Sequence, residues 1–294
     1  MIAEEITDIF LFFKQPTAMS TIQNDDFSKL EYTGWQRVAG KYMDNWAMLT
    51  RQFILPLLDA ANVGKGMKVL DVACGPGLVS EKIYQRKALP VGIDFSPEMI
   101  TLARQLYPHI KFEEGDAQQL PYKNAFFDSV VMNSGMLHLP LPLQAMKEAY
   151  RVLKKNGRFA FTVWAGAAKS PASKVVNDAK EKYADMNVPM PAAPPYAYFE
   201  DKENCKRFLN DAGFDPQTMQ YKTKLVKWKV PTAGFYFDAE LNAGVRNAAF
   251  LRQQSEKTLQ KIKISIEQGM QQFKTNEGYN LPFRGYIVAA EKTV

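Results

Sequence analysis

The residues with the clearest chemical potential lie in the run Val69–Gly77, which reads Val-Leu-Asp-Val-Ala-Cys-Gly-Pro-Gly. An apolar strand here ends at a carboxylate, Asp71, and breaks into a glycine-containing turn before a predicted helix. Glycine lets the backbone approach a ligand closely, so the turn predicts a binding site. A dinucleotide-binding turn carries a third glycine where this chain has Ser80. The turn alone is therefore still compatible with a dinucleotide ligand, but it favours a ligand of another class.

Two further carboxylates follow the next predicted strands. Val91–Asp94 is a strand that ends at Asp94, and Asp116 follows the strand Lys111–Glu114 in the run Gly-Asp-Ala-Gln-Gln-Leu-Pro. In doubly wound folds an acid at the end of the second strand binds ribose hydroxyls, in dinucleotide enzymes as in others. Carboxyl ends of parallel strands meet at one edge of the sheet, so these acids are expected to line one crevice.

Taken together, these motifs resemble those of the Rossmann-like (class I) S-adenosylmethionine-dependent methyltransferases. The resemblance implies S-adenosylmethionine as methyl donor and S-adenosylhomocysteine as product. It implies that Asp71 meets the ammonium of the donor, Asp94 the ribose hydroxyls and Asp116 the adenine amino group. The other cofactor-binding residues that it implies are Ala73, Cys74, Gly75 and Gly77 in the turn, Phe95 and Met99 beside the adenine, Ala117 and Gln118 after the third acid, and Asn133 and Ser134 after the fourth strand.

The acceptor is predicted to be a small molecule. The tetrapeptide Asn-Pro-Pro-Tyr or Asp-Pro-Pro-Tyr, typical of enzymes that methylate exocyclic amines of DNA bases or amide nitrogens, does not occur. Glu148–Leu153 and Lys155–Arg158 are similar to segments of small-molecule and quinone-biosynthesis C-methyltransferases. Such transfer is an in-line displacement that depends mainly on positioning.

A general base is needed when a hydroxyl or carbon acceptor must lose a proton, and histidine suits this near neutral pH. The chain holds two histidines, and His109 is expected in a surface loop. His138, just after the fourth strand, is the catalytic candidate, although a packing role is an open alternative. Trp35, Tyr42 and Trp46 could close over the sulfonium or pack in the core.

The elements that position these residues alternate between strands and helices, which predicts an α/β fold with a doubly wound, mostly parallel sheet. We expect seven strands, at Lys68–Val72, Pro90–Asp94, Lys111–Glu114, Asp128–Asn133, Arg158–Trp164, within Thr218–Val230, and Gly285–Ala290. Helices are expected at 79–86, 97–106, 143–153 and 202–212, and one or two cap helices within 35–58.

The last part of the chain is expected to cover the site. A possible helix at 174–186 and a proline-rich stretch predict a lid, and residues 235–276 a helical insertion. In that insertion we expect a single long helix with an apolar stripe, which packs in the core or forms a homodimer seam. The stripe consists of Leu251, Ser255, Leu259, Ile262, Ile266, Met270 and Phe273.

In the strand before the insertion, Lys222 and Lys224 lie at even positions and Lys227 and Lys229 at odd ones, which predicts a β-bulge near Leu225. The expected divisions are 1–60 for the cap, 61–165 for the binding core and 166–294 for the lid and last strands of the same domain.

Composition bounds the class of protein. The 294 residues, 46% hydrophobic and 23% charged, are typical of a globular enzyme, and the net charge of +6 permits nucleic-acid binding without requiring it.

Cys74 and Cys205 lack the spacing of metal ligands, so no metal site is expected. The acidic N-terminus and the short apolar run Ile9–Phe13 predict no signal peptide and no membrane span, hence a cytoplasmic protein. Met19 is a second candidate start.

Two other functions stay open at this stage. The C-terminal lysines could serve an RNA- or protein-directed methyltransferase, provided that they lie beside the crevice, although solvated faces are the commoner use of such runs. Alternatively, the chain could be a non-catalytic S-adenosylmethionine-binding subunit whose stripe helix recruits a partner.

Overall fold

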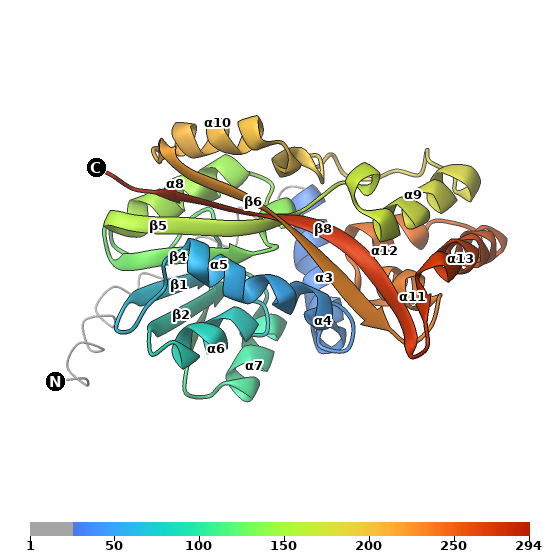
Figure 1. Cartoon of the computed structure of the whole chain (residues 1–294), viewed down its shortest axis with the longest axis horizontal. Helices are drawn as coiled ribbons and strands as arrows, with labels where there is room; N and C mark the ends of the chain where they lie inside the picture. Colours follow the sequence, from blue (N-terminus) through green and yellow to red (C-terminus); the bar gives the residue numbers. More distant parts are fainter. Residues whose placement is uncertain (1–25) are drawn as a thin grey trace.

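The computed structural model describes residues 26–294, so the proposed start at Met19 lies outside the described part. Its centre is one mixed sheet with strand order β3-β2-β1-β4-β5-β8-β6 (Figure 1). The strands on this path are β1 (Lys68–Val72), β2 (Leu89–Asp94), β3 (Lys111–Glu114), β4 (Phe127–Asn133), β5 (Leu153–Trp164), β6 (Asp215–Val230) and β8 (Gly278–Glu291). The pairs from β3 to β5 are parallel, and β8 runs antiparallel to both β5 and β6.

The predicted α/β class and mostly parallel sheet are confirmed, but the strand count of seven is wrong. The sheet has eight strands, because the two-residue strand β7 (Lys274–Thr275) pairs with the start of β8. This pair is a short hairpin at the end of the helical insertion, and a segment of two residues carries no periodic signal by which the sequence could reveal it.

Helices cover both faces of the sheet (Figure 1). One face is covered by α5 (Ile54–Ala60), α6 (Leu78–Gln85) and α7 (Pro97–Leu106), the other by α8 (Pro142–Val152) and α10 (Lys202–Ala212). Successive side chains of a strand point to opposite faces, so Val69 and Leu70 of β1 belong to different core clusters. The parallel strands are therefore apolar on both faces, and their polar residues gather at the ends.

Two cap helices precede the sheet, α3 (Asp26–Tyr42) and the short α4 (Ala47–Thr50), which leads through the 3-10 turn Arg51–Phe53 into α5. This confirms the helices expected within 35–58. Helix α3 packs against α7 of the core and against α11 (Phe235–Ala243) and α12 (Arg246–Leu251) of the later insertion. Residues far apart in the sequence are thereby brought to one place.

The insertion between β6 and β8 holds α11, α12 and α13 (Glu256–Met270), and α13 packs against α9 (Pro171–Tyr183) (Figure 1). The single stripe helix predicted from Leu251 to Phe273 is wrong. The chain breaks after α12, and Ser255 caps α13 by accepting a hydrogen bond from the Thr258 amide at 3.1 Å. Ile262, Ile266 and Met270 are fully buried in the chain's own core.

The predicted bulge near Leu225 is also wrong. Pairing between β6 and β8 is continuous from Gln220 to Val230, and the irregularity lies between Asp215 and Gln220. The outward parity of the lysines changes because the two halves of β6 are covered on opposite faces. Tyr221 faces the core under α10, whereas Val226 and Trp228 face the core under the insertion. No helix of residues 26–294 combines the length and apolar character needed to cross a bilayer.

Candidate active site

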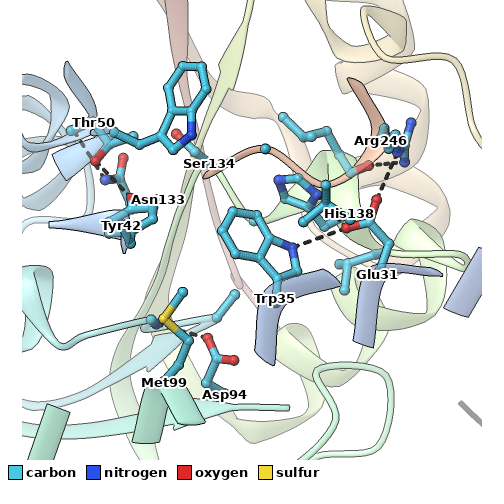
Figure 2. Close-up of a pocket in the computed structure, with 18 of the residues that line it drawn as sticks. Glu31, Trp35, Tyr42, Thr50, Asp94, Met99, Asn133, Ser134, His138 and Arg246 are labelled. Atoms are coloured by element: carbon cyan, nitrogen blue, oxygen red, sulfur yellow. Dashed lines mark hydrogen bonds and ion pairs between the residues drawn. The ribbon is translucent and has the colours of Figure 1, made fainter. Parts of the chain in front are cut away.

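A cavity of about 210 Å³ lies at the carboxyl ends of β1, β2 and β4, and residues of α3, α11 and α12 form part of its wall. Figure 2 shows ten of its lining residues with labels. The cavity is lined by twelve of the fourteen residues expected in the site, namely Ala73, Cys74, Gly75, Asp94, Phe95, Met99, Asp116, Ala117, Gln118, Asn133, Ser134 and His138. Asp71 and Gly77 do not line it. The sequence pattern thus located the crevice, and the structure separates residues on its surface from residues behind it.

The turn after β1 is built from unusual backbone angles. Ala73 and Gly75 have φ of 52° and 51°, and an added Cβ at Gly75 would meet nothing within 4 Å, so this part of the turn faces open space. Gly77 is different, because its φ is 85° and a Cβ there would lie 2.6 Å from Cζ of Phe112. Gly75 therefore leaves room for a ligand, whereas Gly77 allows the start of α6 to pack closely on the core.

Asp71 lies directly behind this turn and is fully buried. Its Oδ2 accepts a hydrogen bond from Ser80 Oγ at 2.6 Å, while Oδ1 has no hydrogen-bond partner among the described residues. Burial raises the pKa of Asp71 to about 7 from an ordinary value of 3.8. An unsatisfied carboxylate oxygen behind the turn is a feature that an ammonium group would complement. Ser80, where a dinucleotide turn would have glycine, thus serves to hold Asp71.

Asp94 and Asp116 each lie at the cavity. Asp94 accepts hydrogen bonds from the amides of Gly75 at 2.8 Å and Ser96 at 2.9 Å, so it ties the two strand ends together. Burial raises the pKa of Asp94 to about 6 in spite of these bonds. Asp116 Oδ1 accepts from the Gln118 amide at 2.8 Å, and burial raises its pKa too. Both carboxyl groups keep lone pairs that further hydroxyl or amino donors can use.

The cysteine of the turn is not a nucleophile. Cys74 is buried, and burial raises the pKa of its thiol well above the ordinary value, so the thiolate is disfavoured. Phe95 and Met99 line the same side of the cavity.

The end of β4 is held by a small polar network. Thr162 Oγ1 donates to Asn133 Oδ1 at 2.7 Å and accepts from the Ser134 amide at 2.8 Å, and Ser134 has φ of 61°. Asn133 Nδ2 also donates to the Thr50 carbonyl at 3.3 Å. The strand end is therefore tied both to β5 and to the cap, which positions the following loop with His138.

His138 does not stand alone. Its Nδ1 lies 2.8 Å from Oε2 of Glu31 on α3, and Trp35 Nε1 donates to the same oxygen at 3.1 Å (Figure 2). Arg246 Nε, from α12, donates to Oε1 of Glu31 at 2.9 Å, and Arg246 also donates to the Leu137 carbonyl. Burial would raise the pKa of Glu31, but His138 and Arg246 outweigh burial and lower it.

Sequence reasoning missed Glu31 and Arg246. They lie 215 positions apart, and only the docking of α12 against α3 joins them. The spacing of four between Glu31 and Trp35 was the one local signal that both face the same way.

The remaining wall of the cavity is aromatic. Trp35, Tyr42 and Trp46 all line it, while Trp46 also stacks on the buried Trp228 at 5.1 Å, so this residue serves both the site and the core. Tyr236 and the buried Glu240 of α11 line the far end, and burial raises the pKa of Glu240. In residues 26–294 no group of three or more histidine, cysteine or acidic side chains could hold a metal ion.

Comparison with known proteins gives one consistent family. The family described as "Methyltransferase domain" matches residues 70–161. The chain is 33% identical over 158 residues to the 2-phytyl-1,4-beta-naphthoquinone methyltransferase of Arabidopsis thaliana, an alignment of 50% of this chain and 58% of that protein. It is 27% identical over 174 residues to the demethylmenaquinone methyltransferase of Renibacterium salmoninarum, covering 56% and 73%.

A solved structure from Bacillus halodurans, described as a methyltransferase, has the same fold, with a TM-score of 0.53 at 21% identity over 83% of this chain and 100% of that one. The chain thus spans little more than half of the plant relative, and the family match at residues 70–161 contains the turn and the acids. With its carboxylates at successive strand ends, the matched core is similar to the S-adenosylmethionine-dependent methyltransferases in both sequence and fold.

Proposed function

We propose that this protein is an enzyme that transfers the methyl group of S-adenosylmethionine to a small, apolar acceptor. The observation that carries the proposal is one cavity that brings carboxylates and aromatic rings together. Asp94 and Asp116 line it, and so do the tryptophan and tyrosine side chains of the cap and insertion. The carboxylates suit a polar donor, and the aromatic rings suit an apolar acceptor beside it.

On the donor side, the residues fit the group they are proposed to hold. The open space beside Gly75 leaves room for the amino-acid part, and Asp71, buried behind the turn rather than lining the cavity, would act on the ammonium through the charge of its unpaired carboxylate. Asp94 would accept from the ribose hydroxyls and Asp116 from the adenine amino group. The bound donor supplies an activated methyl on a positively charged sulfur, and the chain contributes mainly orientation and exclusion of water.

Aromatic surface dominates on the acceptor side. Trp46, Trp164, Tyr236 and Phe283 line the cavity, which favours a flat, apolar molecule. The relatives are named for naphthoquinone and menaquinone substrates, and an acceptor of comparable ring size is consistent with this wall. The two cysteines are free and buried, which accords with the proposed cytoplasmic location.

The test is a transfer screen with S-adenosylmethionine labelled in its methyl group and a cell extract separated into small-molecule, protein and RNA fractions. We expect label in the small-molecule fraction with the purified chain as the only added protein. Asp94→Ala, which removes the proposed ribose contact, is the negative control. Label confined to protein or RNA would overturn the acceptor class, and no transfer to any fraction would favour a non-catalytic subunit.

A further inference from the structure

The contacts around His138 define how its ring is oriented. Glu31 is ionised, because Oε1 forms an ion pair with Arg246 Nε at 2.9 Å, and a carboxylate can only accept hydrogen bonds. Nδ1 of His138, 2.8 Å from that carboxylate, must therefore carry the proton. In the neutral ring this leaves Nε2 as a lone-pair acceptor on the opposite edge. No residue of the described range is hydrogen-bonded to Nε2, and the ring lines the cavity.

The carboxylate is itself fixed. Glu31 is 1% exposed, and its two oxygens receive Arg246 Nε on one side and Trp35 Nε1 with His138 Nδ1 on the other. The rings of Trp35 and His138 also pack perpendicular to each other, with centroids 4.9 Å apart. Arg246 is in turn held by the carbonyls of Leu137 and Pro194 and lies 4.3 Å from the Phe27 ring. The histidine thus has one orientation available.

We infer that Glu31 and Arg246 are positioning residues that make His138 the proton acceptor of the methyl transfer, and that the acceptor substrate is therefore one whose methylated oxygen or carbon carries a proton. This rests on the proposed function. A phenol, an enol or a hydroxylated ring qualifies, whereas a tertiary amine or a thioether, which has no proton to lose, does not.

The step balances without another reactant. The acceptor oxygen or carbon forms the bond to the methyl carbon as the bond from that carbon to the sulfonium sulfur breaks, and the sulfur keeps the electron pair. The proton of the acceptor passes to Nε2 of His138. The imidazolium, hydrogen-bonded to Glu31, later releases this proton to solvent, and the products are the methylated acceptor and S-adenosylhomocysteine.

The charges around the His138 ring predict opposite effects on its imidazolium form when Glu31 or Arg246 is replaced. The charged groups that face His138 are Glu31 on α3, Arg246 on α12 and Asp94 at the end of β2. Glu31→Gln leaves the Arg246 cation uncompensated, which disfavours the imidazolium of His138. Arg246→Met leaves the Glu31 anion uncompensated, which favours it.

The direct test is a nuclear magnetic resonance titration of protein labelled with ¹⁵N-histidine. Only two histidines occur, and His109, whose Nε2 lies 3.1 Å from Glu81 on the surface, is the internal reference. We expect the Nδ1–H tautomer for His138 and shifts of opposite sign in the two variants, with His109 unchanged. An Nε2–H tautomer, or shifts of the same sign, would overturn the inference. If Glu31→Gln does not fold, Arg246→Met against the charge-retaining Arg246→Lys carries the same comparison.

Turnover is the second readout, measured with methyl-labelled S-adenosylmethionine and whichever small-molecule fraction takes up label. We expect His138→Gln to lose about a hundredfold in kcat and Glu31→Gln at least about tenfold, with S-adenosylhomocysteine affinity within about twofold of wild type. The acidic limb of kcat/KM should move to lower pH in Glu31→Gln. Glu81→Gln, which breaks the other glutamate–histidine pair, is the matched control and should change nothing.

The two levels of the proposal fail in different ways. If the wild-type chain methylates no fraction, the proposed function fails, although the tautomer and titration results can still stand. If the wild type transfers methyl and both His138→Gln and Glu31→Gln keep the full rate, the base assignment is wrong and the methyltransferase stands. Label on a tertiary amine or thioether would likewise overturn the substrate class.

Discussion

Asp71→Asn should make the cofactor-free protein more stable above neutral pH and should lower its affinity for the methyl donor. The carboxyl group is fully buried, one oxygen has no hydrogen-bond partner among the described residues, and burial raises its pKa to about 7. Asparagine has nearly the same shape, can keep the hydrogen bond with Ser80, and carries no charge to desolvate.

The size and sign follow from the pKa difference. An acid whose pKa is higher in the folded than in the unfolded chain binds more protons when folded, so folding stability falls as pH rises between the two values. For Asp71 these are about 7 and 3.8, and above that range the loss is complete. About three pH units at about 1.4 kcal/mol each set an upper bound of about 4 kcal/mol on the free energy that the charge costs.

The assay is urea unfolding of wild type and Asp71→Asn at about pH 4 and about pH 8, without cofactor. Asp94 and Asp116 have pKa shifts of the same sign, so only the difference between the two proteins isolates Asp71. We expect that difference to be small at the lower pH and to reach about 2–4 kcal/mol at the higher one. Asp211→Asn, on an exposed position of α10, is the control and should show no such change.

A stability difference that is equal at both pH values would refute the reasoning about the buried charge. Binding of S-adenosylhomocysteine is measured on the same proteins, and Asp71→Asn should lose at least about tenfold in affinity, since a charged partner of the ammonium is removed. Unchanged affinity together with the expected pH dependence would show that Asp71 is a strained buried acid but does not serve the ammonium.

Other expectations address the remaining parts of the site and core. Gly77→Ala should cost about 2 kcal/mol or more in unfolding free energy, because its Cβ would lie 2.6 Å from Phe112, whereas Gly75→Ala should cost only about 1 kcal/mol and instead weaken S-adenosylhomocysteine binding in calorimetry. Asp94→Asn should lower S-adenosylhomocysteine affinity by about tenfold in the same measurement; an unchanged value would contradict the ribose assignment. Ile266→Ala should cost about 2–5 kcal/mol in urea unfolding without altering the sedimentation coefficient, and a shift in sedimentation would instead support the dimer seam.

The grouping of the three acids was accessible to sequence reasoning because its determinants are local. Each acid lies at or just after the end of a strand, and strand ends of a parallel sheet necessarily share one edge, so Asp71, Asp94 and Asp116 could be placed together without knowing the strand order. The helix Lys202–Ala212 was predicted exactly, because Asp201 caps its start and Gly213 with φ of 104° ends it.

Predictions from the sequence failed where long-range packing determines the structure. No sequence pattern near Glu31 predicts its contact with Arg246, because that contact depends on how α12 docks against α3. The parity change along β6 suggested a bulge near Leu225, yet it reflects a change in which face is covered, and coverage is a tertiary property. Ser255 fitted the apolar stripe by position, although its hydroxyl made it a better helix cap.

The long ribbon of β6 and β8 has a consequence for how this protein could change over evolutionary time. Near Asp215 and Glu291 the ribbon is part of the core, but its other end, from Val226 to Val230, carries the insertion that supplies Arg246 and Tyr236. The insertion enters and leaves through adjacent antiparallel strands, so it can be lengthened, shortened or exchanged without disturbing the parallel strands that carry the three acids. The wall proposed to face the acceptor can therefore diverge rapidly, while the end of the cavity proposed to face the donor stays unchanged.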